Sequence, residues 1–272
     1  MPELPEVETI KNKLLPQVVG RRFTDVRLFD DKILRQPSPE DFRNRLVGQT
    51  IKDIGRRGKY LLFHIDQGTL ILHLKMTGFL LLQPSSAKPE PYTRAVFHLD
   101  NDTKLCFCDQ RKFGAIWLVK DEAEVVGKLG PESLDSNFTP EVLSQILSRH
   151  STPIKALLCD QNIIAGIGNM YADEALFAAR IHPLKKAKDL SREEAERLHG
   201  AIRQILTAAI GYGGASVDTY QHPDGKLGTA HFFFRVAHRG GKSCSSCGTP
   251  IERISLRGRG TYFCPKCQGI GT

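Results

Sequence analysis

Residues 1–18 read MPELPEVETIKNKLLPQV, and the rest of the chain is organised around them. Apolar side chains recur in this stretch at the spacing of one face of an amphipathic helix. They are Val7, Ile10, Leu14, Leu15 and Val18. Pro5 suits the first turn of a helix, where no backbone N–H is needed, and glycine favours helix ends. We therefore expect a helix over residues 4–18, stopped by Gly20.

The second residue gives the same stretch a chemical meaning. A small residue after the initiator favours removal of Met1, so we expect a mature chain that starts with the secondary amine of Pro2. Free α-amino groups titrate near pH ~7.7–8, and a neutral amine can attack a sugar carbon and form a Schiff base. Glu3 and Glu6 stand beside it as proton carriers. The simpler alternative is an acidic helix start, stabilised by the helix dipole.

Composition restricts the class of protein. The chain has 272 residues and a net charge of +8, which favours a polyanionic partner such as nucleic acid. It contains no apolar run of the roughly 18 residues that a membrane span requires. Its start is acidic and amphipathic, unlike a secretory signal, so we expect a cytosolic protein without a membrane anchor.

Short apolar or alternating runs follow up to residue 119, separated by turn residues. They cover residues 23–28, 50–54, 60–65, 69–74, 79–82, 95–99, 104–108 and 115–119. This pattern predicts an antiparallel β-sandwich or barrel with the N-terminal helix packed on it.

Three turns in this half are more polar than a plain sandwich needs: residues 55–60, 73–78 and 109–114. The first is a basic turn flanked by glycines, which either approaches phosphate or is simply solvated. Met76 and Phe113 occupy the expected tips of the other two. They are candidate wedges for a base stack, with Arg111 filling the space of an extruded base. The alternative places both side chains in the core.

Residues 131–138 resemble a linker, and helical patterns follow. We expect helices from about 139 to 147, 153 to 164, 170 to 179 and 191 to 211. Residues 166–169 interrupt them as Gly-Ile-Gly-Asn, which is either a phosphate-holding turn or an ordinary glycine cap. After residue 212 we expect a loop that leads into a strand starting at Phe232–Phe234.

Four cysteines give the strongest single signal. Cys244-x2-Cys247 and Cys264-x2-Cys267 are separated by sixteen residues, which is the spacing of a four-cysteine zinc site. Four protein ligands leave no open position, so the zinc is expected to be structural. The other three cysteines, Cys106, Cys108 and Cys159, lie in apolar surroundings and are expected in the core.

Six motifs in this order resemble bacterial formamidopyrimidine-DNA glycosylases, also called 8-oxoguanine DNA glycosylase/AP lyases. They are residues 1–9, 58–61, 73–78, 109–114, 166–171 and 258–265. The resemblance covers nearly the whole chain. It implies an α+β multidomain fold: an N-terminal helix on an antiparallel β-sandwich, then a helix–two-turn–helix domain with a C-terminal four-cysteine zinc finger.

The resemblance also implies domains, cofactor and partner. The expected divisions are a catalytic sandwich at 1–130, a linker at 131–138, a helix–two-turn–helix domain at 139–222, and a lesion loop with the zinc finger at 223–272. One structural Zn²⁺ is expected. The expected partner is double-stranded DNA containing oxidised bases, bound by a monomer in the bacterial cytoplasm and, through its DNA, at the nucleoid.

Residue roles follow from the same resemblance. Pro2 resembles the family's nucleophile, Glu3 its proton donor and Glu6 a buried supporting carboxylate. Lys59 and Arg259 resemble the residues credited with assisting the β- and δ-elimination steps. The residues expected to contact DNA are His73, Met76, Tyr92, Arg111, Phe113, Lys155, Asn169 and Tyr171. The resulting function is removal of oxidised purines such as 8-oxoguanine and formamidopyrimidines, followed by cleavage of the strand.

The chain departs from the family pattern in three places. Tyr92 and Arg94 stand where many members carry histidine, and residues 219–222 and 234–240 are poor matches. Leu4 favours this family over the related endonuclease VIII enzymes, which tend to carry glycine there. Two alternatives stay open: a sister enzyme for oxidised pyrimidines, and a non-catalytic protein that binds damaged DNA.

Overall fold

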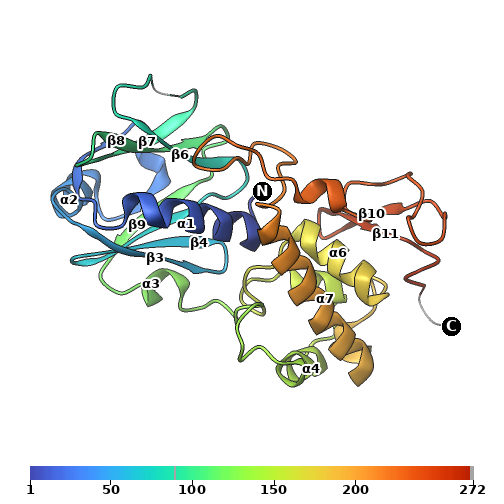
Figure 1. The fold of residues 1–272 in the computed structure, drawn as a ribbon. Helices are drawn as coiled ribbons and strands as arrows, with labels where there is room; N and C mark the ends of the chain where they lie inside the picture. Colours follow the sequence, from blue (N-terminus) through green and yellow to red (C-terminus); the bar gives the residue numbers. More distant parts are fainter. Residues whose placement is uncertain (89, 270–272) are drawn as a thin grey trace. The chain divides into compact units, whose positions relative to one another are not determined.

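The computed structural model describes residues 1–88 and 90–269 (Figure 1). Contacts divide the chain into two compact units. The first contains residues 1–128 and 212–231, and the second contains residues 129–211 and 232–272. Residues 212–231 therefore pack with the N-terminal part of the chain, although they follow the last long helix of the second unit.

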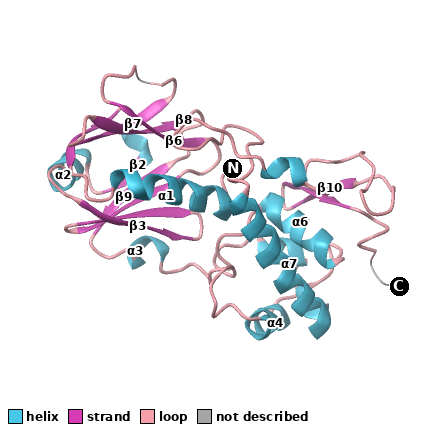
Figure 2. Cartoon of the chain, in the orientation of Figure 1, coloured by secondary structure: helices cyan, strands magenta, loops and turns pink. Residues whose placement is uncertain are grey.

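The first unit is built on two sheets, visible as two layers of strands in Figure 2. One sheet has the order β1-β7-β8-β6 and is antiparallel throughout. Its strands are β1 (Phe23–Leu28), β6 (Gly78–Pro84), β7 (Thr93–Leu99) and β8 (Thr103–Asp109). The other has the order β2-β9-β5-β4-β3 and is antiparallel except for the β2–β9 pair. Its strands are β2 (Leu34–Gln36), β3 (Ile51–Arg57), β4 (Tyr60–Ile65), β5 (Gly68–His73) and β9 (Ala115–Val119).

The predicted sandwich with its N-terminal helix is confirmed. Helix α1 (Leu4–Val18) packs on β3 and β4 and has the bounds that the apolar spacing predicts. Val7, Ile10 and Leu14 enter a core shared with inward-facing residues of both sheets. Burial of this apolar stripe, more than helix propensity, keeps α1 in place.

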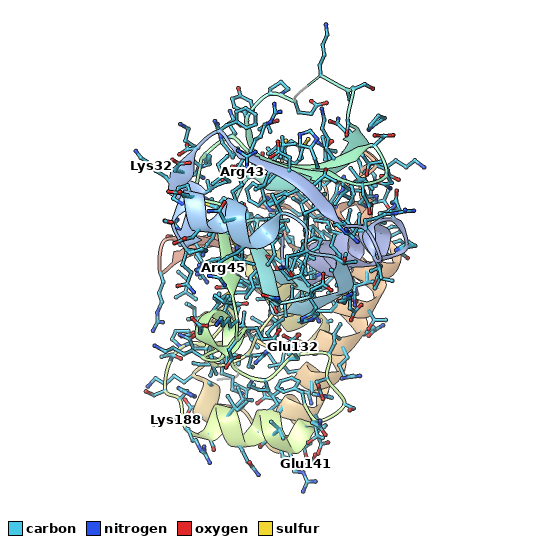
Figure 3. The ribbon with its side chains drawn as sticks, turned by 90° about the vertical axis from the view of Figure 1, so that its left-hand side faces the viewer. Lys32, Arg43, Arg45, Glu132, Glu141 and Lys188 are labelled. Carbon is cyan, nitrogen blue, oxygen red and sulfur yellow. The ribbon has the colours of Figure 1, made fainter. Side chains whose placement is uncertain are left out.

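Three short helical segments of the first unit are absent from the sequence prediction: the 3₁₀ turn η1 (Asp31–Ile33), α2 (Pro39–Leu46) and α3 (Ala123–Val126). Helix α2 buries only Phe42 and Leu46, which is too few apolar positions to show a period. Its Arg43 and Arg45 lie on the outer side, where Figure 3 labels them, and Arg43 pairs with Asp25 at 3.0 Å.

The second unit is helical and ends in a hairpin. Its elements are α4 (Pro140–Ser148), α5 (Ile154–Leu158), α6 (Asn169–Ala179), the 3₁₀ turn η2 (Ala187–Asp189), α7 (Arg192–Gly211), β10 (Glu252–Leu256) and β11 (Arg259–Phe263). Ser191 and Glu194 form a capping box at the start of α7, with hydrogen bonds of 3.2 and 2.8 Å.

Two predictions here are wrong. The helix expected over 153–164 ends at Leu158, because the Asp160 side chain accepts from the backbone N–H of Asn162 and turns the chain. The strand expected at Phe232–Phe234 is instead the end of a 3₁₀ turn, η3 (Ala230–Phe233). Only Phe234 of the three is buried, so this run is not a strand entering a core.

Candidate active site and zinc centre

The start of α1 holds three buried residues of the expected catalytic set: Pro2, Glu3 and Glu6. Glu6 is fully buried, and one of its carboxylate oxygens accepts the backbone N–H of Glu3 at 2.7 Å. The other oxygen accepts the backbone N–H of Ala215 at 2.8 Å. Glu6 thus anchors the residues around Pro2, as a supporting carboxylate would.

Lys59 lies in the tight turn between β3 and β4, where Gly58 adopts a positive φ of 56°. The Arg56 guanidinium binds the Glu8 carboxylate of α1 at 2.6 Å and the carbonyl of Gly58 at 2.9 Å. This ion pair fixes the turn that carries Lys59 to the helix that carries Glu3. The basic turn is therefore tied to the candidate catalytic helix, and Lys59 itself is buried.

His73 ends β5 beneath the turn that follows it. Its Nδ1 accepts the backbone N–H of Lys75 at 2.9 Å, and its ring meets the edge of Tyr60 with centroids 4.4 Å apart. Burial lowers the pKa of His73 well below its usual value, and the charges of Lys75 and Lys59 lower it further. The His73 ring therefore shapes the turn that follows β5, and its expected contact with DNA stays a prediction.

The structure brings Met76, Arg111 and Phe113 together. Met76 and Phe113 are 41% and 46% exposed, so neither tucks into the core. The Arg111 guanidinium lies 3.3 Å from the Met76 sulfur and 4.8 Å from the centre of the Phe113 ring. The three side chains form one exposed group on two neighbouring loops, which suits insertion between bases.

Tyr92 is half-exposed and adopts a positive φ of 64°. Its carbonyl accepts the backbone N–H of Asp109 at 3.0 Å, and Arg94 donates to the Asp109 carbonyl at 2.8 Å. The departure from histidine therefore leaves an aromatic ring and a cation beside the loop that carries Arg111.

In the second unit, Lys155 and Tyr171 are nearly fully buried. The Lys155 ammonium lies 2.7 Å from the Asp173 carboxylate and donates to the carbonyl of Gly260 at 3.1 Å. The Tyr171 ring packs edge-on against Phe234. Both side chains are buried here, and their expected contact with DNA stays a prediction.

Asn169 begins α6 directly after the Gly-Ile-Gly turn, and its amide nitrogen donates to the carbonyl of Gly260 at 2.9 Å. Gln161 stabilises the same turn by accepting from Gly166 at 3.0 Å and donating to Ile167 at 2.7 Å. The turn is thereby attached to the β10–β11 hairpin through Asn169.

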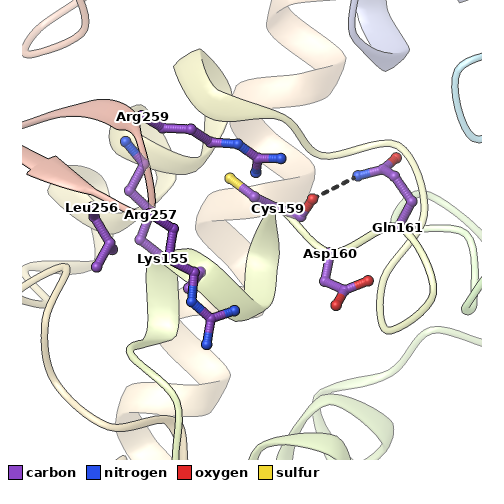
Figure 4. Close-up of a pocket in the computed structure, with 8 residues that line it drawn as sticks. Lys155, Cys159, Asp160, Gln161, Leu256, Arg257 and Arg259 are labelled. Carbon is purple, nitrogen blue, oxygen red and sulfur yellow. Dashed lines mark hydrogen bonds between the residues drawn. The ribbon is translucent and has the colours of Figure 1, made fainter.

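Arg259 lies at the tip of that hairpin and is exposed. It borders a hollow of about 360 Å³ between the hairpin and the end of α5, shown in Figure 4. The other lining residues are Lys155, Ala156, Cys159, Asp160, Gln161, Leu256 and Arg257. Two arginines at the rim of one hollow can bind phosphate oxygens.

The four predicted zinc ligands converge. The Sγ atoms of Cys244, Cys247, Cys264 and Cys267 all lie within 4.8 Å of one another. The Cys244–Cys267 and Cys247–Cys264 sulfur pairs are 3.9 and 3.5 Å apart, close to the roughly 3.8 Å edge of a tetrahedron with 2.3 Å Zn–S bonds. Backbone N–H groups of Ser246 and Cys267 point at sulfurs, as thiolates favour. The residues fit one structural zinc ion with a closed shell.

Three buried carboxylates were missed by sequence reasoning: Asp109, Asp173 and Glu174. Asp109 accepts from the backbone of Gly114 at 2.7 Å. Glu174 accepts from three successive backbone N–H groups, those of residues 235–237. The only sequence signal is an acidic residue amid apolar neighbours, as in residues 170–179.

Comparison with known families accounts for most of the chain. The formamidopyrimidine-DNA glycosylase N-terminal domain matches residues 1–116, and the formamidopyrimidine-DNA glycosylase H2TH domain matches residues 129–221. The zinc finger found in FPG and IleRS matches residues 241–269. The chain belongs to the formamidopyrimidine-DNA glycosylase family.

Individual family members agree over nearly the full length. The formamidopyrimidine-DNA glycosylase of Symbiobacterium thermophilum is 43% identical, over 99% of this chain and 90% of the relative. That of Geobacillus kaustophilus is also 43% identical, over 98% of this chain and 100% of the relative.

Solved structures of a family member are similar as well. A Lactococcus lactis FPG mutant in complex with Fapy-dG-containing DNA has a TM-score of 0.93 and 36% identity, over 98% of this chain and 100% of that one. The L. lactis Fpg bound to abasic-site DNA has a TM-score of 0.92 and 35% identity, with the same coverage. Among the described residues of the chain, no helix is both long enough and apolar enough to cross a membrane.

Proposed function

We propose that this protein is a base-excision-repair glycosylase and AP lyase for oxidised purines, including 8-oxoguanine and formamidopyrimidines. The observation that carries the proposal is the start of α1, where Glu6 anchors both Glu3 and the loop at Ala215. Such support gives Pro2 and Glu3 a fixed geometry, which nucleophilic and acid–base catalysis both require.

The reaction starts with extrusion of the damaged base, because its sugar is out of reach inside the duplex. Met76 and Phe113 enter the stack and offset the cost of unstacking, while Arg111 occupies the vacated space. The free amine of Pro2 then forms a bond to C1′ of the sugar, and the C1′–base bond breaks. Glu3 transfers the protons that this step requires.

Strand cleavage follows from the covalent intermediate. Loss of the ring oxygen bond gives an iminium between Pro2 and C1′, which makes the C2′ proton acidic. Removal of that proton expels the 3′ phosphate in β-elimination, assisted by Lys59, and a second elimination expels the 5′ phosphate. Arg259 stabilises the phosphate charge in these steps.

The second unit holds the DNA backbone in this proposal. Asn169 and Arg259 come from the α6 turn and the hairpin that it contacts through Gly260, and the zinc ion holds the hairpin's base. The net charge of +8 favours such a partner. We further propose that the protein acts as a monomer on double-stranded DNA in the bacterial cytoplasm.

Borohydride trapping tests the proposal. The purified protein is incubated with an 8-oxoguanine duplex and borohydride, and the adduct is mapped by mass spectrometry. We expect a covalent link at Pro2, and none in a variant that retains an extra residue before Pro2 yet still binds the duplex. A protein with a free N-terminus and full zinc that forms no adduct would contradict the lyase assignment. Preferential trapping on a thymine glycol duplex would instead support a pyrimidine-specific enzyme.

A further inference from the structure

Asp109 is a fully buried carboxylate at the end of β8, and its partners lie on two different loops. Its Oδ1 accepts the hydroxyl of Thr77 at 2.5 Å and the backbone N–H of Arg111 at 3.2 Å. Its Oδ2 accepts the backbone N–H of Gly114 at 2.7 Å. One carboxylate therefore closes the 109–114 loop and joins it to the neighbouring 73–78 loop.

Thr77 completes this arrangement and extends it to a third segment. Besides donating to Asp109, its hydroxyl accepts the backbone N–H of Arg111 at 3.1 Å. Its carbonyl accepts the hydroxyl of Thr219 at 3.2 Å, across 142 residues of chain. Thr77 lies directly after the exposed Met76 at the tip of the 73–78 loop. It therefore connects this tip to the start of the 109–114 loop and to Thr219 in the third segment.

The residues at the ends of the two loops, where they join the strands, have little room to adjust. A Cβ on Gly114 would lie 2.6 Å from the Phe107 ring, and one on Gly78 would lie 2.4 Å from the carbonyl of Leu74. Lys75 and Lys112 adopt positive φ angles of 53° and 59°, which cost energy in residues with a side chain. Loops with rigid ends and exposed tips are the form that a preorganised wedge requires.

We infer that Thr77 and Asp109 are a positioning pair that couples insertion of the two wedge loops to the loop around Thr219. The inference rests on the proposed function, in which Met76, Arg111 and Phe113 replace an extruded base. A wedge repays the cost of unstacking only if its own loop is already ordered. The buried carboxylate orders both wedge loops before DNA arrives, and the Thr77 carbonyl links them to the 212–231 segment.

Thr77→Val tests the pair, with Thr77→Ser as its matched control. Valine keeps the volume of threonine but removes the hydroxyl that bridges Asp109 and Arg111, whereas serine keeps the hydroxyl. Base extrusion is followed by the fluorescence of 2-aminopurine placed beside an 8-oxoguanine in a duplex. Single-turnover excision is measured on the same duplex, and strand cleavage is measured at an abasic site in single-stranded DNA, where no base has to be extruded.

We expect Thr77→Val to slow extrusion and excision roughly tenfold or more, because a hydrogen bond to a charged group is lost. The rate of cleavage at the single-stranded abasic site should stay within about twofold of the wild-type rate, because no base has to be extruded there. A twofold change in rate corresponds to only a small fraction of the free energy of such a hydrogen bond. Thr77→Ser should behave like the wild type in all three assays. Asp109→Asn, which also keeps the volume, should slow extrusion in the same selective way.

A double-variant cycle tests the link to the third segment. Thr219→Val removes the bond to the Thr77 carbonyl, and we expect its effect on excision to be non-additive with that of Thr77→Val. Additive effects would overturn the coupling. Equal loss in all three assays, or a Thr77→Val protein indistinguishable from Thr77→Ser, would overturn the positioning role. Failure of the wild type to cleave any of the substrates would contradict the proposed function itself, whatever the variants do.

Discussion

Glu6 accepts a hydrogen bond from the backbone N–H of Ala215 at 2.8 Å, across 209 residues of chain. The preceding Gly214 has a positive φ of 77°, and a Cβ there would lie 2.9 Å from the same carboxylate oxygen. Tyr220 adds a bond from its hydroxyl to the carbonyl of Gly213 at 3.0 Å. The start of the candidate catalytic helix and the 212–231 segment are thus parts of one hydrogen-bonded structure.

Glu6→Gln should uncouple them. The amide keeps the volume but replaces one acceptor oxygen by a donor, so the N–H of either Glu3 or Ala215 loses its partner. An unsatisfied buried group costs about 1–3 kcal/mol, and we expect 8-oxoguanine excision to fall by roughly five- to 150-fold. Hydrogen exchange of the amides at 213–216 should become faster. Glu193→Gln, an exposed change of the same kind on α7, should alter neither excision nor hydrogen exchange. A Glu6→Gln protein that behaves like Glu193→Gln in both measurements would refute the anchoring role of Glu6.

Removing the zinc should affect the second unit alone. Cys264→Ala breaks the four-sulfur shell, and Cys106→Ala, a buried cysteine outside it, is the matched control. We expect Cys264→Ala to lose its zinc, the amide protection of β10 and β11, and most of its DNA affinity, because structural zinc stabilises its finger directly. Trp117 in β9 is the chain's single tryptophan and lies in the first unit, so its fluorescence should not change. Unchanged exchange in the hairpin of zinc-free protein would contradict this role.

Arg259→Ala should change how DNA affinity depends on salt. Each phosphate contact releases condensed counterions, and loss of one contact lowers the slope of log K against log salt by about 0.9 on duplex DNA. Arg192→Ala is the control, because this exposed arginine of α7 is paired with Glu196 at 2.9 Å. Affinities measured by fluorescence anisotropy at several salt concentrations decide the matter. An unchanged slope for Arg259→Ala would remove this residue from the phosphate contacts.

Features set by local pattern were predictable from the sequence. Helix α1, the strand texture of the first unit and the cysteine spacing each depend on residues close together in the chain. The resemblance added the elimination roles expected of Lys59 and Arg259, which no spacing reveals. The exposed positions of Met76 and Phe113 were left open by the residues, and only the tertiary structure distinguishes a wedge from a core side chain.

Long-range polar contacts were not predictable. Asp173 and Glu174 accept from backbone groups far away in sequence, and Asp109 accepts the hydroxyl of Thr77 on a neighbouring loop. The identity of an acidic residue does not indicate whether its side chain is solvated or buried. Lys155 illustrates the converse, because the sequence does not indicate that this lysine is buried and paired with Asp173. Helix α5 ended early for a similar reason, since its apolar residues continue beyond the turn at Asp160.

The Lys155–Asp173 pair gives the second unit a pH dependence. Burial raises the pKa of Asp173 to about 7, although the Lys155 charge and the N–H of Tyr262 oppose the shift. The folded protein therefore binds a proton that the unfolded chain releases at lower pH. The stability that this group contributes is present at low pH and is lost as the pH rises through about 7.

Replacing both charges should remove this dependence. In Lys155→Met/Asp173→Asn the asparagine oxygen still accepts from Tyr262, whereas no buried charge is left to titrate. We expect the wild-type thermal midpoint of the zinc-dependent calorimetric transition to fall more between pH 5 and pH 8 than that of the double variant. Glu193→Gln should follow the wild type. Cysteine protonation weakens zinc binding at low pH in all three proteins alike, so the difference between them isolates Asp173. Parallel midpoints at both pH values would show that Asp173 does not titrate in this range.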